Sequence, residues 1–138
     1  MIYTCTLNPA IDYRMTLGDF KKNALNRASK TTLSPGGKGI NVSIVLKRLG
    51  RDSRQLGFEG GFTGKYLTDY LKDTFDLDPW FTHVNGQTRI NVKLGIENGE
   101  TEINAPAPTV TQDQYEEFLK TTENIGKDDV LVRAGSDI

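Results

Sequence analysis

The residue pattern with the clearest chemical meaning is a glycine-rich stretch, Pro35-Gly36-Gly37-Lys38-Gly39-Ile40-Asn41-Val42-Ser43, that leads into an expected helix. Glycine has no Cβ atom, so the backbone at Gly36 and Gly37 can approach a ligand closely. The first turn of a helix adds N–H donors and a partial positive charge, which favour phosphate or hydroxyl oxygens. Lys38 adds a full positive charge, and Asn41 adds a side-chain amide. The pattern therefore predicts a site for an anionic or hydroxyl-rich ligand.

This stretch does not match the nucleotide-binding P-loop. That pattern requires glycine, four residues, and then Gly-Lys followed by Ser or Thr. Here Thr32 stands where the first glycine is required, and Gly39 follows the lysine. Gly64-Lys65 also fails, because Glu59 and Tyr66 occupy the required positions. A glycine-rich turn beside a solvated lysine stays the alternative, because turns use glycine for its backbone freedom whether or not a ligand binds.

The single cysteine and the single histidine carry no comparable pattern. Cys5 lies in an apolar stretch, has no second cysteine for a disulfide, and has no Cys/His cluster around it for a zinc site. We expect it to be a small core residue. His83 has no carboxylate or cysteine close to it in the sequence, and general-base catalysis needs a positioned partner. We expect it to be structural or exposed.

Strand and helix patterns alternate on both sides of the glycine-rich stretch. Strands are expected at 2–7, 12–17, 27–33, 55–58, 80–84, 88–94, 101–104 and 129–133, and helices at 40–49, 63–75 and from the Thr111 cap to about 122. The alternation predicts an α/β domain with a mainly parallel sheet. The hairpin signal Asn98-Gly99 and the early exposed strands indicate an antiparallel accessory sheet beside it. Residues 34–39 are expected to hold no regular structure.

Composition excludes several classes of protein. The chain has 138 residues, of which 25% are charged, and its net charge is −1, which is typical of a soluble globular domain. This balance gives no support to a nucleic-acid or membrane-surface partner. The sequence shows no signal-peptide pattern, and no apolar run approaches the roughly 20 residues of a membrane span. A cytoplasmic location is expected.

Five segments, in order, resemble the PfkB (ribokinase-like) carbohydrate kinase family. They are Leu7-Asn8-Pro9-Ala10-Ile11-Asp12, Asn26-Arg27, Gly36 to Ser43, Thr88-Arg89-Ile90-Asn91 and Thr101-Glu102-Ile103-Asn104. The amino-acid sequences of these segments are most similar to those of the 1-phosphofructokinases of that family, with tagatose-6-phosphate kinases as near neighbours. The resemblance implies a three-layer α/β/α ribokinase-like (Rossmann-like) sheet with a small antiparallel β lid, whose strands lie within 12–17, 27–33 and 88–104.

The resemblance also implies a role for each matching residue. Asp12 would accept hydrogen bonds from sugar hydroxyls, and Lys38 and Arg89 would hold the phosphate, for which a guanidinium offers two matched donors. A turn carboxylate stays the alternative for Asp12, and a solvated hairpin charge for Arg89. Asn91 shares a strand face with Arg89 by the period of two. In full, the expected substrate-binding residues are Asp12, Gly36, Gly37, Lys38, Asn41, Arg89, Asn91 and Ser136.

The expected activity of the complete enzyme is ATP-dependent phosphorylation of fructose 1-phosphate to fructose 1,6-bisphosphate, with ATP and Mg²⁺ as cofactors and a possible homodimer through the lid. No catalytic residue, bound cofactor or metal ligand is expected in this chain. The family's Gly-Ala-Gly-Asp motif with its catalytic aspartate does not occur, and Val130-Leu131-Val132 reads as a central strand with no crossover after it. We therefore expect the amino-terminal part of one kinase domain, inactive alone. A tagatose-6-phosphate kinase, a non-catalytic sugar-phosphate-binding fragment, and a broken gene product without a stable fold stay open.

Overall fold

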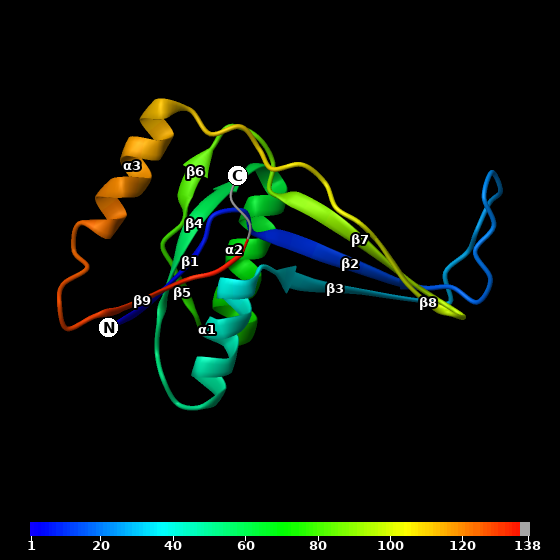
Figure 1. Cartoon of the computed structure of the whole chain (residues 1–138), viewed down its shortest axis with the longest axis horizontal. Coiled ribbons are helices and arrows are strands. Elements are labelled where there is room, and N and C mark those ends of the chain that lie inside the picture. Colours follow the sequence, from blue (N-terminus) through cyan, green and yellow to red (C-terminus); the bar gives the residue numbers. More distant parts are fainter. Residues whose placement is uncertain (136–138) are drawn as a thin grey trace.

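The computed structural model describes residues 1–135, which form a layered body and a second sheet that extends from it (Figure 1). The sheet of the body has the order β5-β4-β1-β9, with β6 also paired to β4, and every pairing in it is parallel. Its strands are β1 (Ile2–Thr6), β4 (Arg54–Gly60), β5 (Asp78–Pro79), β6 (Thr82–Val84) and β9 (Val130–Arg133). The predicted parallel sheet is confirmed.

Three helices cover the two faces of this sheet: α1 (Lys38–Arg48), α2 (Gly61–Phe75) and α3 (Gln112–Thr122). Two separate apolar clusters form the core. One consists of Tyr3, Cys5, Leu56, Phe58, Val84 and Phe118, the last from α3. The other joins residues of α1 and α2 and consists of Ile11, Ile40, Ile44, Leu67, Leu71 and Leu77. The predicted three-layer α/β/α arrangement is therefore confirmed.

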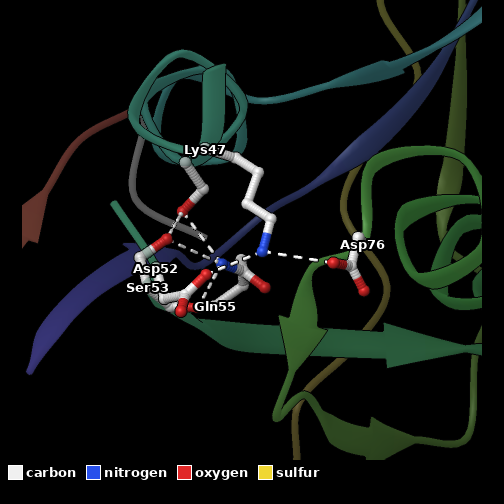
Figure 2. Close-up of polar contacts among 6 residues, drawn as sticks. Lys47, Asp52, Ser53, Gln55 and Asp76 are labelled. Atoms are coloured by element: carbon white, nitrogen blue, oxygen red, sulfur yellow. Dashed lines mark hydrogen bonds and ion pairs between the residues drawn. The ribbon is translucent and has the colours of Figure 1, made fainter. Parts of the chain in front are cut away.

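A buried polar network fixes α1 against the sheet (Figure 2). The Ser43 hydroxyl lies 2.8 Å from the hydroxyls of both Thr4 and Ser53, and Gln55 Nε2 donates to Ser43 Oγ at 3.0 Å. Further along the helix, Lys47 Nζ lies 2.7 Å from Asp52 Oδ1, and it also forms an ion pair with Asp76 just after α2. Because buried polar groups are costly without partners, the bonds of Ser43 favour one position of α1, and with it one position of the glycine-rich stretch at its start. The Lys47 ion pairs lie at the surface and contribute little.

The second sheet, here called the accessory sheet, has the strand order β3-β2-β7-β8. Its strands are β2 (Ala10–Thr16), β3 (Lys30–Gly36), β7 (Arg89–Ile96) and β8 (Gly99–Ile103). The β2–β3 and β7–β8 pairs are antiparallel, as expected, and the second is the predicted Asn98-Gly99 hairpin, but β2 and β7 run parallel. Both of these strands leave the body and extend outward (Figure 1), so they share a direction, and the sheet is mixed.

The prediction that residues 34–39 hold no regular structure was wrong. β3 begins at Lys30, three residues later than expected, and continues through Gly36, while α1 begins at Lys38. Pro35 is tolerated because β3 is an edge strand, where a missing N–H need not break a ladder bond. The glycine-rich stretch is therefore a short junction between a strand and a helix.

Two expectations about burial also differ from the structure. Helical spacing groups Tyr66 with Tyr70 and Phe75 as apolar residues and so predicts it in the core. It is instead 41% exposed and stacks on Tyr70, because Leu67 and Leu71 fill the buried side of α2. β9, expected as a central strand, lies at the edge of the sheet formed by residues 1–135, with Val130 and Leu131 exposed. Cys5 is buried as predicted, and burial raises the pKa of its thiol. No helix within residues 1–135 is long and apolar enough to cross a membrane.

Candidate functional site

A cavity of about 300 Å³ opens where the start of α1, the end of β1 and the accessory sheet meet. Six of the eight predicted site residues line it: Asp12, Gly37, Lys38, Asn41, Arg89 and Asn91. Gly36 lies beside them, where a Cβ atom would stand 2.7 Å from Asp12 Oδ1. Ser136 lies outside the described residues. The fold therefore brings together residues from three separate stretches of the chain.

The start of α1 gives the cavity one wall of backbone donors. Gly37 precedes the helix with φ 124, a conformation that favours glycine, and it provides no side-chain cap. The Asn41 amide makes the first bond of the helix, to the Gly37 carbonyl at 3.0 Å, so the amides of residues 38–40 have no acceptor within the helix. Gly39 allows close packing, because a Cβ there would lie 2.4 Å from Thr6 Oγ1. Free amides beside the exposed Lys38 suit an anionic ligand.

Strand β7 forms the opposite wall of the cavity. Its two predicted site residues, Arg89 and Asn91, also form hydrogen bonds to the backbone of neighbouring segments. The Arg89 guanidinium donates to the carbonyl oxygens of Asn8 at 3.1 Å and Ala105 at 3.5 Å, and Asn91 Oδ1 accepts from the Ala105 amide at 3.0 Å. Arg89 is half-buried, so the alternative of a solvated hairpin charge was wrong. Asn91 is buried and lies on the cavity side of β7 with Arg89, as the period of two predicted.

Sequence reasoning missed several cavity residues, and Lys93 is the most informative. Its ammonium lies 3.6 Å from Asp12 Oδ2 and 3.7 Å from Glu102 Oε1. The period of two that linked Arg89 to Asn91 also leads to Lys93, so this residue could have been found. The other missed lining residues are Thr6, Asn8, Glu102, Asn104, Ala134 and Gly135.

The cavity also concentrates buried polar atoms that lack protein partners. Within residues 1–135, six buried side-chain atoms have no hydrogen-bond partner, and three of them belong to cavity residues: Thr6 Oγ1, Asn8 Oδ1 and Arg89 Nε. Such atoms are uncommon in native structures. Thr6 is the last residue of β1 and Asn8 follows it, so both lie at the carboxyl end of this strand, which is where open α/β sheets hold their ligands. That rule was the available signal for these two residues.

The single histidine, His83, lies outside the cavity. His83, 67% exposed as expected, pairs through Nδ1 with Glu59 Oε1 at 3.0 Å, a partner that is distant in the sequence. Neither residue lines the cavity. In the part of the chain that the structure describes, no group of three His, Cys, Asp or Glu residues could hold a metal ion, and we assign no metal ligand there.

The fold and the cavity can now be compared with known proteins. Residues 6–138 match the pfkB family carbohydrate kinase domain. The chain belongs to the pfkB family of carbohydrate kinases. Over 136 residues it is 48% identical to a 1-phosphofructokinase of Bacillus subtilis, covering 99% of this chain and 44% of that protein. It is 36% identical to a tagatose-6-phosphate kinase of Staphylococcus epidermidis, again covering 99% of this chain and 44% of the relative. This member of the pfkB family thus spans less than half the length of these relatives.

Solved structures agree with this assignment to the pfkB family. The chain superposes with a TM-score of 0.90 on the crystal structure of a Staphylococcus aureus protein proposed to be a phosphofructokinase, at 49% identity, covering 99% of this chain and 44% of the other. Ribokinase of Thermotoga maritima matches with a TM-score of 0.63 at 20% identity, covering 76% of this chain and 36% of the other, which shows a shared fold alone. The predicted ribokinase-like fold is confirmed.

Proposed function

We propose that this chain is the sugar-phosphate-binding part of a 1-phosphofructokinase, an enzyme that transfers the γ-phosphoryl group of ATP to the 6-hydroxyl of fructose 1-phosphate. The observation that carries the proposal is the convergence of Asp12, Lys38, Asn41 and Arg89 on one cavity. The higher identity to a 1-phosphofructokinase than to a tagatose-6-phosphate kinase supports fructose 1-phosphate as the substrate.

Each proposed role follows from the chemistry of the residue. Lys38, Arg89 and the free amides at the start of α1 would hold the phosphate, because they offer positive charge and donors together. Asp12 and Asn41 would bond sugar hydroxyls, with Gly36 and Gly37 leaving room for a close approach. Asn91 would hold Ala105, and through it the edge of the cavity. Ser136 is kept as a proposed contact on the basis of family resemblance.

The remaining steps belong to the whole protein. We place the catalytic aspartate, the ATP site and the Mg²⁺ that accompanies ATP outside residues 1–138, and we propose that this chain alone is inactive. In the complete enzyme the accessory sheet (β2, β3, β7 and β8), which overlaps the lid strands expected within 12–17, 27–33 and 88–104, would act as a lid. Its closure would exclude water, so that ATP is not hydrolysed without sugar phosphate. Pairing of two such lids in a homodimer, and a cytoplasmic location where ATP is available, complete the proposal.

Calorimetry tests the binding role. Fructose 1-phosphate titrated into the chain should give saturable heat, and Lys38→Ala should abolish it because the variant loses a phosphate contact. Lys72→Ala, an exposed lysine of α2 outside the cavity, is the matched control and should bind like the unchanged chain. An unaltered titration for Lys38→Ala would remove Lys38 from the site. Stronger binding of tagatose 6-phosphate than of fructose 1-phosphate would reassign the substrate.

A coupled assay for ADP release tests the proposed division of labour. Residues 1–138 should show no turnover with ATP and fructose 1-phosphate, whereas the full-length protein should show it. Turnover by the 138-residue chain would contradict the placement of the catalytic machinery elsewhere.

A further inference from the structure

Two charged residues of the cavity, Lys93 and Glu102, have no part in the proposed site. They lie opposite each other on the paired strands β7 and β8, and Asp12 lies on β2 at the other side of β7. The Lys93 ammonium stands between the two carboxylates, 3.6 Å from Asp12 Oδ2 and 3.7 Å from Glu102 Oε1. The side chains of Lys93 and Asp12 are 24% and 19% exposed, and that of Glu102 is 50% exposed. Two of the three charges are therefore largely shielded from solvent.

The bridge between these groups is held by charge rather than by directional hydrogen bonds. Both distances exceed the 2.7–3.2 Å range of ordinary N–H···O bonds. Arg89, by contrast, already donates to two backbone carbonyls. The Lys93 ammonium can consequently respond to a new anion in the cavity without giving up a well-formed bond.

The charges that line the cavity nearly balance. Three cations, Lys38, Arg89 and Lys93, face two carboxylates, Asp12 and Glu102. A phosphate monoester carries about −1.5 to −2 near pH 7. Charges a few ångströms apart interact more strongly at partly buried positions than in water, so each charge here matters to an anionic ligand. Without Lys93, both carboxylates would repel a phosphate ester directly.

We propose that Lys93 and Glu102 form a charge-balancing pair that sets the affinity of this cavity for a sugar monophosphate. The positive charge of Lys93 compensates the negative charge of Asp12. The Asp12 carboxylate, which bonds the sugar hydroxyls, can therefore lie next to a bound anion. Glu102 limits the excess positive charge, and thereby disfavours a ligand with two phosphates. This inference rests on the proposed function, because it concerns the same sugar-phosphate site.

Variants that neutralise one charge of the pair at a time should change the affinity in opposite directions. For fructose 1-phosphate measured by calorimetry at low salt, Lys93→Met should weaken binding roughly tenfold, and Glu102→Gln should strengthen it about threefold, since Glu102 is the more solvent-screened charge. The double variant should return to within about threefold of the unchanged chain. Glu102→Gln should also strengthen binding of fructose 1,6-bisphosphate more than that of fructose 1-phosphate. These differences should shrink as salt is added.

Matched controls separate this effect from net charge and from folding. Lys72→Met and Glu117→Gln change the same charges on exposed positions of α2 and α3 and should leave binding unchanged. Circular dichroism verifies that each variant is folded. Weakening by both single variants, or a double variant weaker than Lys93→Met, would indicate a structural role and overturn the inference. Unchanged affinity in all variants would overturn it while leaving the proposed function intact, and absence of binding by the unchanged chain would overturn both.

Discussion

The body and the accessory sheet are stabilised in different ways, although each supplies one wall of the same cavity. Strands β1 and β4 are almost entirely buried and supply most of one apolar cluster, whereas every residue of β8 and most of β3 are exposed. The accessory sheet relies on strand pairing and on ion pairs such as Arg14 with Glu100. Regions with few buried apolar contacts open at lower free energy. One wall of the cavity is therefore the firmly packed start of α1, and the other is a less firmly packed sheet that carries most of the charged side chains.

Truncation of one large side chain in each region should give the widest contrast. Leu56→Ala in β4 removes a side chain with no exposed surface and should lower the free energy of unfolding by about 2–5 kcal/mol. Ile103→Ala in β8, where the side chain is 57% exposed, should cost no more than about 0.5 kcal/mol. Urea denaturation followed by circular dichroism measures both. Equal losses would show that the accessory sheet is packed as firmly as the body.

Gly→Ala substitutions compare the packing of the two regions next to the cavity and far from it. In Gly39→Ala the new Cβ would lie 2.4 Å from Thr6 Oγ1 and 3.1 Å from the Cys5 carbonyl oxygen, so α1 must shift away from β1. We expect a loss of about 1–3 kcal/mol in stability and weaker fructose 1-phosphate binding. Gly18→Ala, after β2, meets no atom within 4 Å and should change neither quantity. A Gly39→Ala variant with unchanged denaturation and binding would show that the close contact of α1 with β1 is not needed.

The buried polar network offers a third contrast. Ser43→Ala leaves the buried Thr4 hydroxyl without its partner and should cost about 1–2 kcal/mol in urea denaturation. Ser29→Ala removes an exposed hydroxyl that donates to the Thr16 carbonyl oxygen at the outer end of the accessory sheet, and it should cost about 0.5 kcal/mol or less. A neutral Ser43→Ala would mean that apolar packing alone positions α1.

Structural features that depend on neighbouring residues in the chain could be predicted from the sequence. Period-two and helical spacings located the helices and the Asn98-Gly99 hairpin, and glycines before an apolar helix located one wall of the cavity. The parallel pairing of β2 with β7 joins residues about 80 positions apart, and no local pattern records it. For the same reason Lys93, although detectable on the face of Arg89, could not be placed between Asp12 and Glu102 before the register was known.

The last contrast is in acid sensitivity and is the smallest. A backbone hydrogen bond from Gly126 and a bond from the amino-terminal ammonium lower the pKa of Asp129 in the body, and the hydrogen bond from Arg14 lowers the pKa of Glu100 in the accessory sheet. A carboxylate with a lowered folded-state pKa stabilises the fold above its unfolded pKa of about 4, and this contribution is lost as pH falls through the folded value.

Asp129→Asn should therefore lower the urea midpoint at pH 6 but not near pH 2, because the amino terminus is attached to β1, which unfolds with the core. Glu100→Gln should leave the midpoint nearly unchanged at both pH values and instead speed hydrogen exchange of β8 amides at pH 6, because β8 is an exposed edge strand that can open locally. If Glu100→Gln shifted the global midpoint as much as Asp129→Asn does, the two sheets would unfold as one cooperative unit, and the separation of a firm body from a weakly held accessory sheet would be wrong.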